Sequence, residues 1–454
     1  MDNYTLKADK NNIKETLLNN SLDRKKYVIG IANCINQADG NLILSLEGDW
    51  GTGKTFVVKQ LEAIFNDEEL KFEWINTQGK DVADKINLND ARVLYYDAWE
   101  NDGSDDPLLN IVYNLAVMSG LKINSKKLTI NKGKVISDLW DLTKNLHPAF
   151  GVVDFIKNYL VVEKTSGSKI NDVIGSETEL KNTIRSFITE IKDKNKKNKL
   201  VIVIDELDRC RPEFALKLLE SLKHYFYEKG IIVILSINTK EIHSIINKYY
   251  GNEIDANLYL EKIIDTRIQL SNVPAETYLN HIFKNEVTEA VIPRAVRMIA
   301  DKYRLSLRQI NRYIGELRLL MPEDVIYGKI TRIEYFSRGY LGFFAYSYLI
   351  PYLIGIRLFC YSDYLKIKNG ENEEMFVNDY FTDENAKLRL KLRFVFPELS
   401  IPEFDDDKNS NETEAVRRIY RIGFSHLACL NEIDESIQNS VQKAIEMCEL
   451  LATN

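Results

Sequence analysis

Residues 45–58, SLEGDWGTGKTFVV, constrain the fold of this chain more than any other stretch. An apolar run precedes the glycines, and apolar residues at helical spacing follow them, which predicts a strand, a loop and a helix in that order. Gly48, four intervening residues and Gly53-Lys54-Thr55 fit the pattern G-x-x-x-x-G-K-[ST]. Glycines let successive backbone N–H groups turn inward, and a helix N-terminus adds positive charge. The stretch therefore predicts a phosphate-binding loop, with an ordinary glycine-rich turn as the alternative.

The loop predicts how a nucleoside triphosphate and its metal ion would be bound. Lys54 would reach the β- and γ-phosphates, and the Thr55 hydroxyl would coordinate Mg²⁺. The predicted nucleotide-binding residues are Gly48, Asp49, Trp50, Gly51, Thr52, Gly53, Lys54, Thr55 and Phe56.

Residues 200–209, LVIVIDELDR, predict a second part of the same site. Five apolar residues followed by acids are typical of a central parallel strand, and α/β sheets bind ligands at the carboxyl ends of their strands. We expect Asp205 to hold Mg²⁺ through water and Glu206 to orient or deprotonate the attacking water. A solvated strand end with ordinary acids is the alternative. Both halves together predict an ATPase with ATP and Mg²⁺ as cofactors.

Two further apolar segments extend the predicted sheet. Residues 231–237 end at Asn238, which we interpret as a sensor of the γ-phosphate or the attacking water. A plain helix cap at Asn238 is the alternative. Residues 93–96 form another predicted strand before an acidic segment. The expected fold class is therefore α/β, a doubly wound parallel sheet of at least four strands.

Residues 275–321 have an all-helical pattern and are the expected lid over the nucleotide. Within it, Arg308 is the candidate arginine that contacts the γ-phosphate, because a planar guanidinium can bind two phosphate oxygens. An exposed helix face is the alternative for Arg308. Arg209 and Arg211 are alternative arginine fingers, with local ion pairs as the other interpretation. The predicted catalytic group is thus Glu206, Lys54, Asn238 and Arg308.

Composition excludes several classes of protein. The chain has 454 residues and a formal net charge of −7, which argues against a broad basic surface for nucleic acids. Its five cysteines contain no CxxC pair, so we expect a reducing compartment and no structural zinc. The first 20 residues lack an apolar leader, and a cytoplasmic location is expected.

One stretch has membrane-like length. Residues 339–356, GYLGFFAYSYLIPYLIGI, contain no charged residue. Four tyrosines and a proline favour a buried hairpin or helix over an interfacial or oligomer-forming segment. Residues 101–199 predict a mostly helical insertion without a membrane span.

Four segments together resemble the KAP family of P-loop NTPases. They are LSLEGDWGTGKTFVVKQL at 44–61, YYDAWENDGSDDPL at 95–108, LVIVIDELDRCRPEFALKLLESL at 200–222 and YLEKIIDTRIQL at 259–270. The resemblance covers residues 24–320. It implies an α/β core of the additional-strand, catalytic-glutamate type, related to STAND and AAA+ ATPases, followed by an all-α C-terminal region. Many members carry transmembrane helices inserted after the P-loop, and this chain is similar to a soluble member.

The expected domains are a core at 1–270 containing the insertion at about 101–199, a helical lid at 271–335 and a C-terminal helical domain at 336–454. The family resemblance implies a nucleotide-driven switch or assembly module in bacterial anti-phage defence, with a protein effector and a homo-oligomeric state. An oligomeric scaffold with little turnover and a DNA-remodelling motor are the alternatives. The guanine-reading Asn-Lys-x-Asp pattern is absent from the sequence, which favours ATP over GTP.

Overall fold

The computed structural model describes ten stretches of the chain. They are residues 6–78, 86–104, 106–118, 189, 197–283, 292–321, 344–381, 408–425, 427–430 and 432–450. Contacts divide the chain into two compact units. We call residues 8–272 the core unit, and residues 273–454 with 1–7 the helical unit. Most of the predicted insertion at 101–199 lies outside the described residues.

The core unit is built on a parallel sheet of five strands in the order β2-β3-β4-β1-β5. The strands are β1 (Leu42–Glu47), β2 (Ala91–Asp97), β3 (Lys199–Asp205), β4 (Ile231–Ile237) and β5 (Thr266–Gln269). Because β4 separates β1 from β3, the glycine-rich loop and the acidic strand end belong to strands that are not direct neighbours. The predicted parallel α/β sheet is confirmed.

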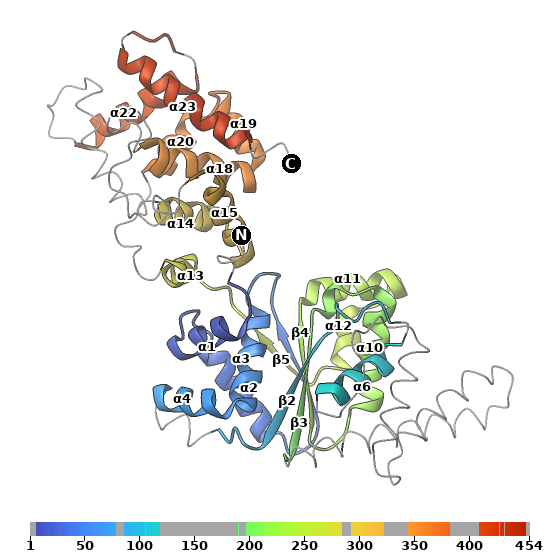
Figure 1. The fold of residues 1–454 in the computed structure, drawn as a ribbon. Coiled ribbons are helices and arrows are strands. Elements are labelled where there is room, and N and C mark those ends of the chain that lie inside the picture. The colour runs from blue at the N-terminus through green and yellow to red at the C-terminus, as the bar shows by residue number, and fades with distance from the viewer. Residues whose placement is uncertain are drawn as a thin grey trace. The chain divides into compact units, whose positions relative to one another are not determined.

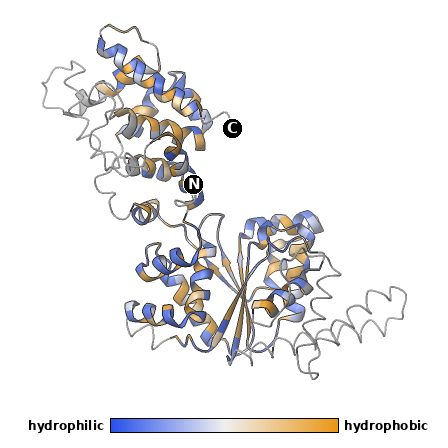
Figure 2. Ribbon diagram, viewed as in Figure 1, coloured by the Kyte–Doolittle hydropathy of each residue, from blue (hydrophilic) through white to orange (hydrophobic). Residues whose placement is uncertain are grey.

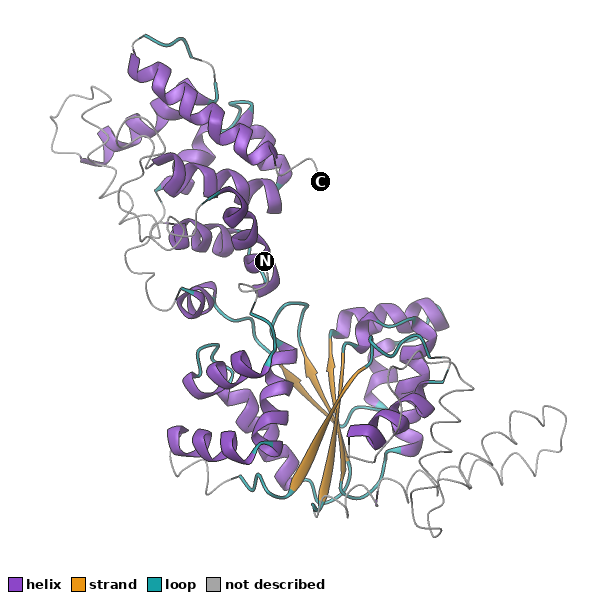
Figure 3. Ribbon diagram, viewed as in Figure 1, coloured by secondary structure: helices purple, strands orange, loops and turns teal. Residues whose placement is uncertain are grey.

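Helices cover both faces of this sheet, as Figures 1 and 3 show. One face carries α1 (Lys10–Asn19), α2 (Lys25–Gln37), α3 (Lys54–Asn66) and α4 (Glu68–Gln78). The other carries α6 (Pro107–Met118), α10 (Pro212–Tyr225), α11 (Thr239–Tyr250) and α12 (Ala256–Glu261). Strands buried on both faces need continuous apolar sequence, which explains the unbroken runs in β3 and β4.

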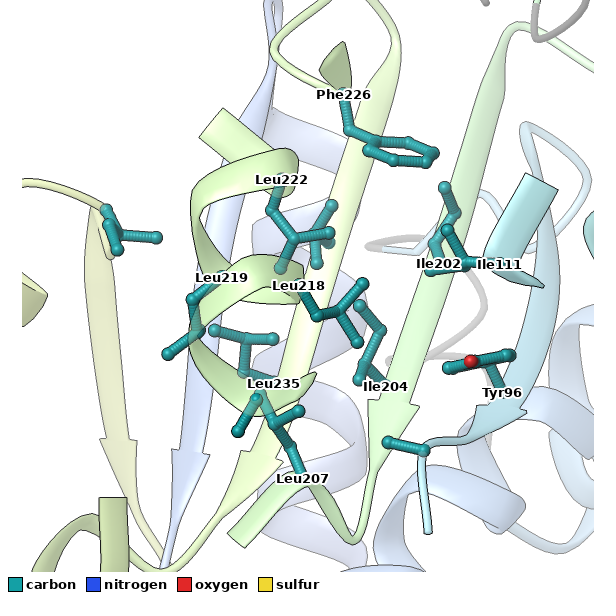
Figure 4. Packing of buried hydrophobic residues seen from close by; sticks show 14 of the residues in the cluster. Tyr96, Ile111, Ile202, Ile204, Leu207, Leu218, Leu219, Leu222, Phe226 and Leu235 are labelled. Carbon is teal, nitrogen blue, oxygen red and sulfur yellow. The ribbon is translucent and has the colours of Figure 1, made fainter. Parts of the chain in front are cut away.

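Alternate residues of β1, β2, β3 and β4 belong to separate hydrophobic cores. On β3, Ile202 and Ile204 pack with Leu218 and Leu222 of α10 (Figure 4). Val203, on the opposite face of the strand, belongs to the core formed with α2 and α3. Figure 2 shows that the strands of the sheet are largely hydrophobic. Because successive side chains of a strand point to opposite faces of the sheet, the position of a residue along the strand determines which core its side chain enters.

The described part of the helical unit contains helices and no strands. They are α13 (Ala275–Ile282), α14 (Ile292–Lys302), α15 (Leu307–Leu320), a π-helical turn (Ala345–Leu349), α18 (Ile350–Phe359), α19 (Tyr361–Lys368), α20 (Glu373–Tyr380), α22 (Lys408–Gly423) and α23 (Glu432–Leu450). The predicted helical C-terminal region is confirmed. Both α14 and α15 pack against α18, and the predicted boundary between a lid at 271–335 and a domain at 336–454 stays a prediction.

The membrane-like stretch is described from residue 344 onward and is helical there. Tyr348 and Tyr352 of this stretch are buried, and the Tyr352 hydroxyl has a polar partner. The Tyr352 hydroxyl donates to Asp379 at 2.8 Å, and the Tyr313 hydroxyl of α15 donates to the carbonyl of Pro351 in α18. The described part of the stretch thus forms the core of the helical unit. Within the described residues, no helix is both long enough and apolar enough to span a bilayer.

Candidate functional site

The loop between β1 and α3 has the backbone that its glycines predict. Gly51 and Gly53 have φ angles of 82° and 90°, in the left-handed region that favours glycine. Gly48 lies in a tight space, because a Cβ atom there would come 2.8 Å from Thr52 Oγ1. The loop ends at Lys54, the first residue of α3. Phosphate bound in this loop would therefore meet the positive end of α3.

Lys54 is held inside the loop. It is buried, and its Nζ donates to the carbonyl oxygens of Gly48 at 2.7 Å and Asp49 at 3.3 Å. Burial lowers the pKa of Lys54, and the carboxylates of Asp208 and Asp205 oppose that shift. Among the described residues, these two carbonyl oxygens are the hydrogen-bond acceptors of the Lys54 ammonium, and a buried ammonium bonded in this way has a strong electrostatic preference for an incoming anion.

Asp205 joins the acidic strand to the loop. Its Oδ2 accepts hydrogen bonds from the Thr55 hydroxyl at 2.8 Å and from the Tyr95 hydroxyl at 3.0 Å. Its Oδ1 accepts one from the backbone N–H of Glu206 at 3.0 Å. The structure thus brings together the two predicted metal-binding residues, Thr55 and Asp205, and Tyr95 is a partner that sequence reasoning missed.

These oxygen atoms fit magnesium chemistry. Mg²⁺ prefers hard oxygen ligands and is often bound by one or two carboxylates together with substrate phosphates. Among the described residues, no group of three or more His, Cys, Asp and Glu side chains could hold a metal ion. A metal ion between Thr55 and Asp205 would therefore need oxygen atoms from a bound phosphate and from water.

Glu206 follows the strand in a constrained conformation. Its φ is 59°, in the left-handed region that is uncommon for residues other than glycine and that concentrates at functional sites. Burial raises the pKa of Glu206, the charge of Asp205 raises it further, and Arg209 opposes the shift. The Glu206 carboxylate forms an ion pair with Arg209. Glu206 therefore lies beside Asp205, the candidate metal-binding carboxylate, and the Arg209 guanidinium holds the Glu206 side chain.

The two candidate arginine fingers of the core unit both have local partners. Besides Glu206, Arg209 lies 5.5 Å from the ring centroid of Trp99. Arg211 pairs with Asp102 at 3.2 Å. These contacts match the interpretation of both arginines as members of local ion pairs. Their roles as arginine fingers stay predictions.

Asn238 caps α11, because its side chain accepts from the backbone N–H of Lys240 at 3.2 Å. Its own backbone N–H donates to Asp208 at 3.2 Å. Asp208 is buried and also accepts from the Trp50 indole at 2.6 Å. Asp208, which sequence reasoning missed, thus connects the loop to the end of β4. The cap was the alternative for Asn238, and its sensor role stays a prediction.

Arg24 is a second connection that sequence reasoning missed. Its guanidinium donates to the Thr52 carbonyl at 2.6 Å and to the Ser271 carbonyl at 2.8 Å. The side chain is buried, and burial lowers the pKa of Arg24 to about 10. One cation therefore fixes the phosphate loop to the segment that follows β5.

The remaining predicted residues lie in different surroundings. Phe56 is buried in the first turn of α3, and the Trp50 side chain is 41% exposed. Asp49 pairs with Lys240 at 2.9 Å. Arg308 is an exposed residue near the start of α15 in the helical unit, and its contact with the γ-phosphate stays a prediction.

Comparison with known proteins agrees with this geometry. No curated protein matches the chain. Over residues 24–322 the sequence matches the model described as the KAP family P-loop domain. The matched region contains all the residues of the phosphate loop, the acidic strand end and the two connections described above. The chain therefore belongs to the KAP family of P-loop NTPases.

Proposed function

We propose that this KAP-family NTPase binds ATP with Mg²⁺ and hydrolyses it. One observation carries the proposal: the Thr55 hydroxyl of the phosphate loop donates to Asp205 at the end of β3, so that both predicted magnesium ligands meet beside the loop. The buried ammonium of Lys54 lies within the same loop.

Each side chain has a role in the proposed reaction. Lys54 and the loop N–H groups neutralise the phosphates, and Thr55 with Asp205 would hold the metal ion. The metal ion supplies positive charge that stabilises the transferring phosphoryl group. Glu206 orients the water and accepts its proton, a role suited to a carboxylate whose pKa is raised. Before it can act as a base, Glu206 must separate at least partly from Arg209.

The proposed biological output is a switch between ATP and ADP states. Differential contacts with the γ-phosphate would determine which state is favoured. We extend the proposal to a homo-oligomeric assembly that acts with a protein effector in anti-phage defence. This extension is supported by the family resemblance, in which bacterial members are often associated with defence.

The hydrolysis proposal is tested with Glu206→Gln, which keeps the size of the side chain and removes its charge. We expect the ATP turnover rate to fall by about 10²- to 10⁴-fold while ATP affinity is retained. Glu213→Gln, at an exposed position in the first turn of α10, is the matched control and should leave turnover unchanged. Normal turnover in Glu206→Gln would remove Glu206 as the base.

The switch is tested by measuring particle mass with ATP, with ADP and without nucleotide. A switch should change its assembly between ATP and ADP. The same mass in all three conditions would contradict it. Parallel titrations with ATP and GTP test the proposed preference for ATP.

A further inference from the structure

The core unit contains a cavity outside the phosphate loop, with a volume of about 490 Å³. Residues of α1, α3, α4 and β2 line it. Its α3 residues extend from Lys59 to Asn66, the last residue of the helix. At 1.5 Å per residue, Lys59 and Asn66 lie about 7.5 Å and about 18 Å along the helix from Lys54. The volume is within the usual range for small-molecule sites, and no residue of the phosphate loop lines the cavity.

Four basic residues line the cavity: Lys10, Lys14, Lys59 and Arg92. The three lysines have acidic partners. Lys10 lies 3.6 Å from Asp67, Lys14 lies 2.7 Å from Glu73, and Lys59 lies 3.1 Å from Glu62.

Arg92 differs from these lysines. Its Nε is buried and has no hydrogen-bond partner, and its side chain has no ion pair within the described part of the chain. Removing an unpaired guanidinium nitrogen from water costs free energy, and a bound oxyanion would offset that cost. A guanidinium also matches the paired oxygens of carboxylates and phosphates.

We propose that this cavity is a second ligand site, which binds a small organic molecule through a phosphate or carboxylate group held by Arg92. The acids that line the cavity do not remove this preference. Glu62 and Asp67 already face Lys59 and Lys10, and Asp67 also accepts the backbone N–H of Leu70 at 3.1 Å. The third acid of the lining, Glu69, lies close enough to Lys14 to help raise the pKa of that lysine.

The cavity is connected to the candidate metal site through two side chains. The Lys59 ammonium lies 3.2 Å from the centroid of the Tyr95 ring, a close cation–π contact. The hydroxyl of the same tyrosine donates to Asp205. A cation over the ring makes that hydroxyl a better donor, so Lys59 strengthens the hydrogen bond that orients Asp205.

An anion bound at Arg92 attracts the Lys59 ammonium away from the ring and weakens this support. Ligand binding in the cavity therefore lowers the affinity of the nucleotide site for Mg²⁺. This second step rests on the proposed function, whereas binding in the cavity does not.

Binding is measured by calorimetry with two probes in separate arms, inorganic phosphate and succinate. The protein carries Lys54→Ala, so that the phosphate loop does not contribute. We expect one-to-one binding of at least one probe, weakened about tenfold or more when Arg92→Gln is added. Adding Arg312→Gln, an exposed arginine of the helical unit, should leave binding unchanged. Failure of both probes to bind, or equal binding after Arg92→Gln, would overturn the proposal.

Further measurements distinguish a loss of binding in the cavity from a loss of the fold, of the coupling to the nucleotide site or of ATP binding itself. Equal thermal unfolding temperatures of the Arg92→Gln and Arg312→Gln proteins show that the fold is intact, and Arg92→Lys should restore part of the binding. In the protein with an intact loop, the bound probe should raise the Mg²⁺ concentration needed for ATP binding by about fivefold. Lys59→Gln should abolish that shift. Probe binding without the shift would overturn the coupling, and absence of ATP binding with normal probe binding would overturn the proposed function alone.

Discussion

Tyr95→Phe should weaken magnesium-dependent ATP binding although Tyr95 touches neither the metal ion nor the nucleotide in the proposed site. The substitution removes one hydroxyl, which lies 3.0 Å from Asp205 Oδ2, and keeps the ring beneath Lys59. Burial and the charge of Asp205 raise the pKa of Tyr95, so the hydroxyl stays protonated and can donate. The affected quantity is the orientation of the metal-binding carboxylate.

The expected size of the effect follows from the three hydrogen bonds to Asp205. A hydrogen bond to a charged group contributes about 1.5–3 kcal/mol, and loss of a residue that orients a metal ligand lowers metal affinity by about 10- to 100-fold. Thr55 and the Glu206 N–H still hold Asp205 in the variant. We therefore expect the lower end of that range, about a tenfold increase in the Mg²⁺ concentration needed for ATP binding.

The assay is calorimetric titration of ATP at a series of Mg²⁺ concentrations. Tyr96→Phe is the matched control, because it makes the same chemical change one residue later, on the opposite face of β2. The Tyr96 hydroxyl donates to Asn110 at 2.9 Å in the other hydrophobic core. Tyr96→Phe should cost about 0.5–1.5 kcal/mol of stability without changing the magnesium requirement. The same magnesium requirement in wild type and Tyr95→Phe would refute the reasoning.

The pH dependence of hydrolysis should reflect two shifted groups. Glu206 acts as a base only when ionised, and its pKa is raised, so turnover should fall on the acid side at a higher pH than for an ordinary glutamate. Arg209→Gln should move this fall to still higher pH, because Arg209 holds the pKa of Glu206 down. Lys54 binds phosphate when protonated, and its pKa is lowered, so ATP affinity should fall on the alkaline side below the usual lysine range. Turnover rate and ATP affinity measured as a function of pH test both predictions. A fall in turnover at the pH of an ordinary glutamate, or a fall in affinity at the pH of an ordinary lysine, would contradict them. Arg24→Gln should weaken ATP binding by about tenfold, because the Thr52 and Ser271 carbonyls lose charged donors. Arg24→Lys should recover only part of the affinity, because an ammonium lacks the planar fork; full recovery in an ATP titration would contradict the bridging role.

Local sequence was enough to predict the sheet and the centre of the candidate site. The spacing from Gly48 to Thr55 and the acids after β3 lie on contiguous stretches with strong local patterns. Parallel strands end at one edge of the sheet, so two motifs about 150 residues apart could be placed together without a structure. The meeting of Thr55 with Asp205 follows from that rule, whereas the KAP-type fold is expected from the resemblance of four segments to that family.

The supporting residues could not be predicted from local patterns. Tyr95 and Tyr96 are adjacent tyrosines in an apolar strand. Their roles differ because their side chains lie on opposite faces of the sheet. Arg24 bonds to a carbonyl 247 positions away in the sequence, and Asp208 differs from its neighbouring acids by its partners, the Trp50 indole and the backbone N–H of Asn238. Such contacts depend on tertiary packing.

ATP binding measured with and without Mg²⁺ tests the central claim most directly. Titration of the wild-type chain beside Thr55→Ala and Thr55→Ser should show magnesium-dependent affinity in wild type. We expect loss of most of that dependence in Thr55→Ala and its recovery in Thr55→Ser, which restores the hydroxyl that meets Asp205. ATP affinity that is independent of magnesium in all three proteins, or no ATP binding by a folded wild-type chain, would contradict the account.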